Sequence, residues 1–123
     1  MKIEISNGEL LDKLSILEIK LEKIQDPAKL ININSEYSLI KPLGDKLMPI
    51  VETQYKSLVD INRSLWEIED TIRNFERKKQ FGEEFIQTAR KVYLLNDERA
   101  QIKKEINRLT NSGIVEEKSY SWY

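Results

Sequence analysis

The sequence contains neither cysteine nor histidine, and these two absences exclude much familiar chemistry. Without cysteine there is no disulfide, thiol nucleophile or thiolate metal site, and without histidine there is no Ser-His-Asp triad or imidazole proton shuttle. Any catalysis would depend on carboxylates, lysine, arginine or tyrosine. We therefore expect no cofactor and favour a binding protein, while enzyme activity stays an open alternative.

Glycine and proline are scarce, with four and three residues in a chain of 123, whereas charged residues make up 33% and hydrophobic residues 40%. This balance is typical of long amphipathic helices and argues against a β-sandwich or a disordered chain. The length suits one domain. We expect residues 1–123 to form a single all-α helical-bundle domain.

Neither a strong net charge nor a long hydrophobic run is present. The formal net charge is −1, so no basic field exists to hold DNA or RNA, and we expect no nucleic-acid partner. No stretch approaches the roughly 18 consecutive apolar residues of a membrane span, and the first residues lack a charged start followed by an apolar run. We therefore expect a cytoplasmic location and no membrane partner.

The strongest pattern in the chain is a long apolar stripe over residues 46–80. Its apolar positions alternate at steps of four and three, interrupted by Gln54, and this spacing predicts one long amphipathic helix. The stripe consists of Leu47, Val51, Leu58, Ile61, Leu65, Ile68, Ile72 and Phe75. At 1.5 Å per residue this helix would be roughly 50 Å long, so the other segments must lie along it.

Start and stop signals predict three further helices, with bounds near 7–25, 27–41 and 83–111. Ser6 and Glu9 form a capping box that starts the first of these helices, and Pro42 with Gly44 is expected to end the second. The short turn at residues 81–82 folds the last helix back antiparallel to the long one. We therefore predict a long antiparallel helical hairpin with two shorter helices packed along it.

The two chain ends lie outside these helices. Residues 2–6 alternate polar and apolar side chains as a short strand does, and residues 114–123 are too apolar and aromatic for a solvated tail. We expect the two segments to dock on each other as a small terminal strand pair. The aromatic end, Trp122 and Tyr123, either anchors to its own bundle or inserts into a protein partner.

Three segments resemble a known family, namely residues 8–20 (GELLDKLSILEIK), 96–107 (NDERAQIKKEIN) and 116–120 (EEKSY). The family that they resemble comprises short bacterial proteins classed as a domain of unknown function, and the likeness spans almost the whole chain. The resemblance implies a stand-alone bacterial domain. It implies no particular reaction and no catalytic residues.

Several polar residues fall on arcs that the helices should bury. With a turn near residues 81–82, facing positions of the hairpin have numbers that sum to about 162, which places Asn62 near Arg99. The first helix adds Glu18 if it packs into the hairpin groove. The predicted cluster consists of Glu18, Glu69, Arg73, Asn96, Arg99 and Lys103. Buried charges of this kind must neutralise one another, reach water or hold a ligand.

Two interpretations of this cluster stay open. In the first, it is a structural polar network that fixes helix register in an interaction or assembly module, and loss of Arg99 then destabilises the fold more than loss of Lys103. In the second, it is the pocket of a small-anion-binding enzyme or sensor. Arg99 and Lys103 would then clamp the anion, and Glu18 or Glu69 would act as acid or base.

Two carboxylate pairs on single helices support a third interpretation. They have the Glu-x-x-Asp spacing with which all-α nucleotide pyrophosphohydrolases hold magnesium. The pairs are Glu9 with Asp12 and Glu67 with Asp70. We expect these side chains to lie mainly on outward, solvated faces, and the Glu-Glu-x-x-Glu element that precedes them in such enzymes is missing. We therefore expect no metal site.

Apolar residues outside the predicted core favour a homodimer. They point away from the face that each helix should bury, so a monomer would leave them in water. The predicted interface consists of Ile16, Ile19, Val59, Trp66, Trp122 and Tyr123.

Overall fold

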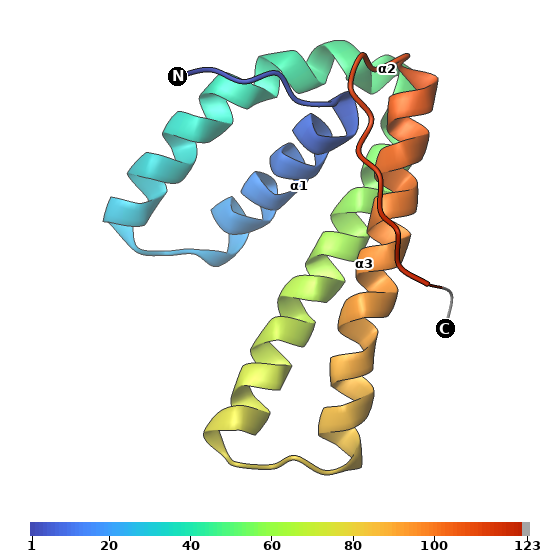
Figure 1. The fold of residues 1–123 in the computed structure, drawn as a ribbon. Coiled ribbons are helices and arrows are strands. Elements are labelled where there is room, and N and C mark those ends of the chain that lie inside the picture. Colours follow the sequence, from blue (N-terminus) through green and yellow to red (C-terminus); the bar gives the residue numbers. More distant parts are fainter. Residues whose placement is uncertain (122–123) are drawn as a thin grey trace.

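The structure, a computed structural model, describes residues 1–121 and is all-helical over this range, as predicted. Its three helices are α1 (Asn7–Lys23), α2 (Pro27–Arg77) and α3 (Glu83–Leu109). Figure 1 shows α1 inside the bend of α2, and the second part of α2 running antiparallel to α3. Within residues 1–121, no helix combines the length and the apolar character that crossing a membrane requires.

One helix, α2, replaces two of the predicted helices. The prediction that Pro42 and Gly44 end a helix is wrong, because α2 continues through both residues and bends at Val51, where φ is −129° and ψ is 24°. Pro49 lies two residues before this bend and lacks the N–H that a helix needs at that point. Gly44 is a packing residue, since a Cβ atom there would lie 2.6 Å from Cδ2 of Leu14 in α1.

The core lies where α1 meets both parts of α2 and the end of α3. Its central residues are Leu11, Leu14, Val51, Tyr55, Leu58 and Ile106. Because α1 lies between the two parts of α2, its side chains are covered on more than one side (Figure 1). Ile19 is consequently only 1% exposed, and the prediction that it needs a partner subunit for burial is wrong.

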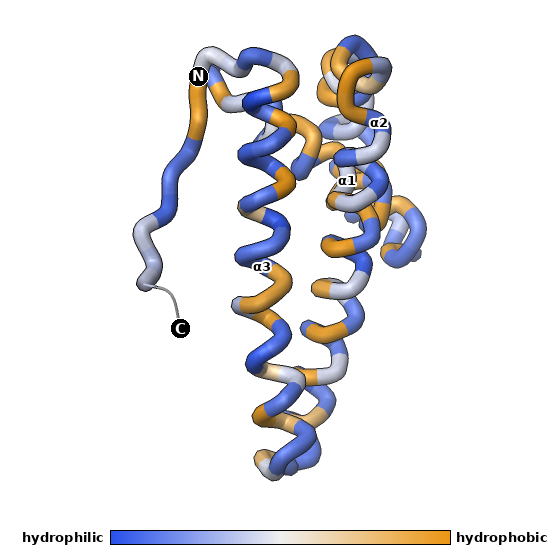
Figure 2. Tube along the Cα trace, turned by 90° about the vertical axis from the view of Figure 1, so that its right-hand side faces the viewer, coloured by the Kyte–Doolittle hydropathy of each residue, from blue (hydrophilic) through white to orange (hydrophobic). Residues whose placement is uncertain are grey.

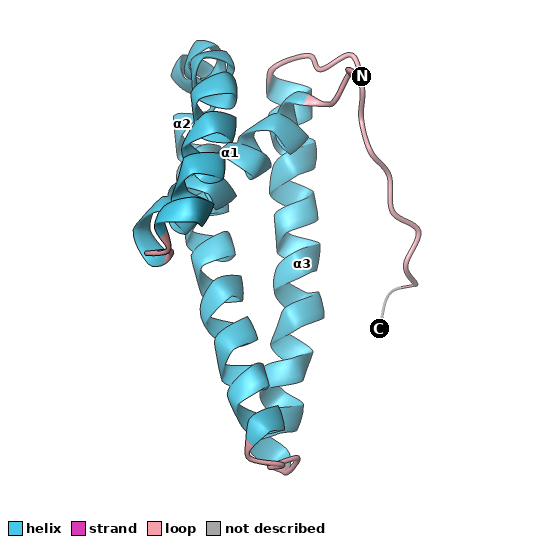
Figure 3. Ribbon diagram, turned by 90° about the vertical axis from the view of Figure 1, so that its left-hand side faces the viewer, coloured by secondary structure: helices cyan, strands magenta, loops and turns pink. Residues whose placement is uncertain are grey.

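The predicted terminal strand pair is not formed in the part of the chain that the structure describes. Figure 3 shows residues 2–6 and 114–121 as loops, and the latter segment runs back beside α3. Its apolar side chains at Ile114 and Val115 are exposed. The contact between the chain ends is polar instead, because Glu116 bonds to Ser6.

The far part of the α2–α3 hairpin extends beyond the end of α1, and we call residues 66–77 and 83–99 the distal hairpin. None of these residues is buried. The rings of Phe75 and Phe85 pack edge to face near the tip, with centroids 6.4 Å apart. Figure 2 shows hydrophobic residues recurring along both helices, and several of them are half-buried although no third element covers this hairpin.

Candidate functional site

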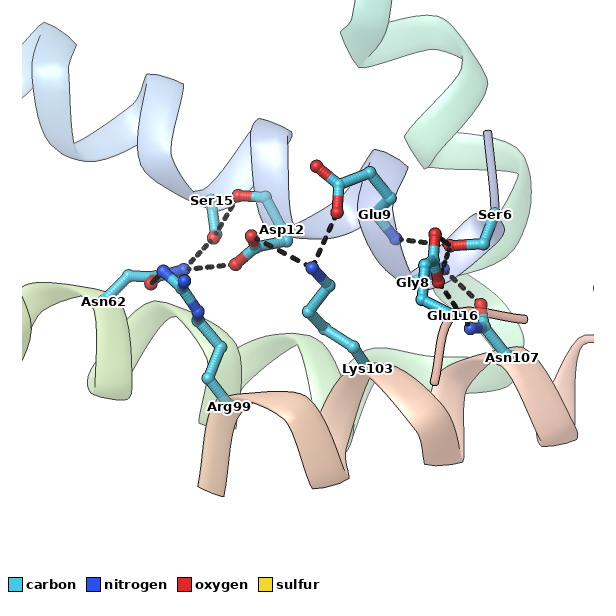
Figure 4. Close-up of polar contacts among 10 residues, drawn as sticks. All are labelled: Ser6, Gly8, Glu9, Asp12, Ser15, Asn62, Arg99, Lys103, Asn107 and Glu116. Carbon is cyan, nitrogen blue, oxygen red and sulfur yellow. Dashed lines mark hydrogen bonds and ion pairs between the residues drawn. The ribbon is translucent and has the colours of Figure 1, made fainter. Parts of the chain in front are cut away.

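The polar cluster lies where α1 crosses α3, and Figure 4 shows how its side chains meet. Lys103 is its central cation: Nζ donates to Oε2 of Glu9 at 2.6 Å and lies 3.6 Å from Oδ2 of Asp12. The side chain of Lys103 is 19% exposed and that of Asp12 is 6% exposed. A largely buried cation therefore compensates two carboxylates from the first turns of α1.

Asn62 of α2 connects this ion pair to Arg99 (Figure 4). Its Nδ2 donates to Oδ1 of Asp12 at 2.8 Å and to Oγ of Ser15 at 2.7 Å, while its Oδ1 accepts from Nη1 of Arg99 at 3.2 Å. Among residues 1–121, none of these four side chains has a buried polar atom without a hydrogen-bond partner. The network thus joins all three helices and is internally satisfied.

A second polar group surrounds the N-terminus of α1. Oγ of Ser6 accepts from the backbone N–H of Glu9 at 3.0 Å, so this half of the predicted capping box is confirmed. The Gly8 N–H donates to Oδ1 of Asn107 at 2.7 Å. The Glu116 carboxylate lies 2.7 Å from Oγ of Ser6 and 3.3 Å from Nδ2 of Asn107. An anion here is favoured by the helix dipole, so Glu116 fixes the C-terminal segment to α1.

The environment of Glu116 favours its charged form. Burial alone would raise its pKa, but hydrogen bonds from Ser6 and Asn107, together with the charge of Lys103, hold the pKa below its usual value. A carboxyl group whose pKa is lower in the folded state stabilises the protein above its unfolded pKa. That contribution is lost as the pH falls through the folded pKa.

We expect Glu116→Gln to lower the melting temperature at pH 7 by roughly 3 to 6 °C, the shift that about 1 kcal/mol produces in a domain of this size. The wild-type carboxyl group takes up protons as the pH is lowered from 7 to 3, so the difference should become smaller at pH 3. Thermal denaturation of the wild type and the variant at pH 7 and pH 3 measures the difference in melting temperature. Glu117→Gln is the control, because Glu117 pairs with Lys104 at an exposed position. An equal shift at both pH values would contradict the ionised contact.

Four of the six predicted binding residues line one groove of about 460 Å³, and they are Glu69, Arg73, Asn96 and Arg99. Glu69 and Arg73 pair with each other at 3.4 Å on an exposed face of α2. Lys103 lies one turn further along α3, in a smaller adjoining cavity that also contains Arg99. The predicted proximity of Asn62 and Arg99 is confirmed by their hydrogen bond.

Glu18 does not join this group. It lines another groove, of about 440 Å³, next to Tyr55 and Val59. Burial raises the pKa of Tyr55 well above its usual value, and the neighbouring Glu18 carboxylate adds to this shift. The predicted link between Glu18 and Arg99 is therefore not formed, because the arc of α1 that faces α3 carries Glu9 and Asp12 instead.

The prediction that Glu9 and Asp12 lie on a solvated face is wrong, since both approach Lys103 and Asp12 is buried. Glu67 and Asp70 are exposed on the distal hairpin. Among residues 1–121, no group of three or more carboxylates is arranged to hold a metal ion. One feature of the sequence could have indicated that Asp12 approaches Lys103 together with Glu9: Asp12 lies three residues after Glu9, on the same face of α1.

The predicted interface residues separate in the structure. Ile16, Ile19 and Trp66 line the same groove as Arg99, whereas Val59 lies in the groove of Glu18. The remaining two, Trp122 and Tyr123, lie outside the described residues. One apolar surface therefore contains half of the predicted interface.

Comparison with protein-family models places the chain in a family. The model of a protein family with the description "Family of unknown function (DUF6165)" matches residues 1–122. No curated protein and no solved structure matches the chain. The family match includes the three segments on which the sequence resemblance depends.

Proposed function

The chain belongs to this family of unknown function, so membership assigns it no role. From the arrangement of its own residues, we propose that it is a homodimeric assembly module. In this proposal, the distal hairpins of two copies pack together. The observation that carries it is that no residue of the distal hairpin is buried. Helices in proteins are stabilised mainly by packing of an apolar face, and two helices alone supply little of it. A second hairpin would complete a four-helix bundle.

The accessible surface area of the chain supports the proposal of a second copy. The chain exposes 8635 Å², whereas a typical monomer of 14.5 kDa exposes about 6,900 Å². The excess, roughly 1,700 Å², is larger than the roughly 800 Å² that each partner buries in a standard interface. Large apolar side chains of the distal hairpin contribute to it, including Ile86 at 48% exposure.

The groove beside Trp66 has the features of a self-complementary contact. Leu65 and Ile16 supply apolar surface, and Asp70 and Arg73 supply charges of both signs one turn apart on α2. In a two-fold symmetric dimer, the groove of one copy contacts the same groove of the other. An acidic side chain of one copy can then lie opposite a basic side chain of the other. The net charge of −1 causes little repulsion between copies.

The buried polar network has a structural role in this proposal. Asn62 and Lys103 connect α1 to α2 and α3, so they hold Ile16 at the edge of the groove. A polar network that is satisfied only in one arrangement favours a single helix register. It would therefore keep the dimer surface in one shape.

We expect the wild-type protein to have twice the monomer mass of 14.5 kDa in light scattering at micromolar concentration. Trp66→Glu places a charge in the contact and should weaken dimerisation roughly 30-fold to 1,000-fold, as the loss of a central aromatic residue does. Leu39→Glu is the matched control, because Leu39 is 74% exposed on the first part of α2 and lies outside the distal hairpin. A wild-type mass of 14.5 kDa, or equal weakening by both variants, would overturn the proposal.

A further inference from the structure

Two adjoining cavities lie between α3 and the C-terminal segment, residues 114–121. The smaller has a volume of about 70 Å³ and the larger of about 660 Å³. Asn96, Arg99 and Lys118 line both, so the two volumes share one boundary. Together they form a site with a narrow polar end and a wide end.

The narrow end is rich in cations. Arg99 and Lys118 line it together with Lys103 and Lys104. Lys103 forms an ion pair with Glu9, and Lys104 forms one with Glu117, each at 2.6 Å. No ion pair between described residues includes Arg99 or Lys118. These two side chains therefore have charge left for a ligand.

Within the described part of the chain, the partners of Arg99 and Lys118 are neutral groups. Arg99 donates one hydrogen bond to the Asn62 amide. This bond uses only one of the five N–H donors of the guanidinium group. Nζ of Lys118 lies 5.9 Å from the centre of the Tyr120 ring. The one carboxylate in the lining of the narrow end, that of Glu116, is turned toward Ser6 and Asn107 (Figure 4). Arg99 and Lys118 thus line the same small volume.

The wide end offers planar and polar surfaces. Tyr93 and Tyr120 are both in its lining, and aromatic rings of this kind stack on planar ligands. Asn96 adds an amide that can bond to ring substituents or hydroxyl groups. The volume at this end accommodates a nucleoside.

We propose that this site binds a nucleoside monophosphate, with the phosphate between Arg99 and Lys118 and the base against Tyr93 and Tyr120. A phosphate monoester carries close to two negative charges at neutral pH, which matches the two cations that form no ion pair with a carboxylate of residues 1–121. Arginine binds phosphate through a planar fork, and lysine adds a point charge. The proposal concerns binding within one copy and does not depend on the dimer.

Isothermal titration calorimetry of the full chain with adenosine 5′-monophosphate, adenosine and inorganic phosphate tests the site. We expect the nucleotide to bind at least tenfold more tightly than either fragment, because only the nucleotide reaches both ends. Lys118→Met and Arg99→Met should each weaken nucleotide binding at least tenfold. Lys118 lies in an exposed segment, so its variant tests the site even if Arg99→Met fails to fold.

Lys91→Met is the matched control, because Lys91 lies on the other flank of α3 and lines a separate groove. We expect it to bind the nucleotide like the wild type. Three results would overturn the proposal: no binding at millimolar concentration, equal affinity for the nucleotide and inorganic phosphate, or equal weakening by Lys91→Met and Lys118→Met.

Discussion

Replacing Lys103 with methionine should lower the free energy of unfolding by roughly 3 kcal/mol, toward the lower end of the cost of breaking a buried ion pair. Methionine keeps most of the side-chain stem and removes only the charge. Glu9 and Asp12 would then lie close together without a cation, and Asp12 is almost fully buried. Urea denaturation of the variant and the wild type measures the difference.

The neighbouring Lys104 provides a closely matched control. Its Nζ lies 2.6 Å from Glu117, the same distance that separates Lys103 from Glu9. The side chains of this second pair are 51% and 68% exposed, so water screens the charges. Lys104→Met should therefore cost at most about 1 kcal/mol. Equally small losses in both variants would show that the pair in the α1–α3 contact is not structural.

The sequence predicts that Arg99 matters more to stability than Lys103, whereas the ion pairs in the structure lead us to expect the opposite order. The rule that facing positions of the hairpin have numbers with a constant sum correctly places Asn62 next to Arg99. The rule works because the turn of an antiparallel hairpin fixes which positions face each other. It cannot place α1, whose rotation depends on contacts distant in the chain. That rotation brings Glu9 and Asp12 to Lys103, so the ion pairs form there.

The sequence pattern misjudges the role of Gly44. Apolar periodicity predicts the helical content, but it cannot tell a glycine that ends a helix from one that lets two helices approach. Gly44 lies within α2 and accommodates Leu14, and Gly8 lies in the first turn of α1. The end of a helix is a local property, whereas a close contact depends on the partner element.

The C-terminal segment shows a similar limit. Its apolar composition suggests a buried strand, yet Glu116 provides its anchor through Ser6 and Asn107. The anchor exists because α1 presents its N-terminus beside the end of α3. Only the packed fold creates that anion site, so composition could not reveal it.

Gly8 of α1 packs against the backbone of α3, and a methyl group there should force the two helices apart. A Cβ atom at this position would lie 2.5 Å from the backbone oxygen of Lys103 and 2.9 Å from Oδ1 of Asn107. The first of these atoms belongs to a helix backbone, which cannot move alone. The second accepts the hydrogen bond of the Gly8 N–H, so displacement also breaks that bond.

We therefore expect Gly8→Ala to lower the free energy of unfolding by roughly 2 to 4 kcal/mol, because overpacking and a lost buried hydrogen bond outweigh the better helix propensity of alanine. Gly113→Ala is the control, since a Cβ atom there meets nothing within 4 Å and its φ is not positive. It should change stability by no more than about 0.5 kcal/mol. Urea denaturation compares the two. If both alanine variants were as stable as the wild type, α1 would not approach α3 this closely, and the ion pair of Lys103 with Glu9 could not form as described.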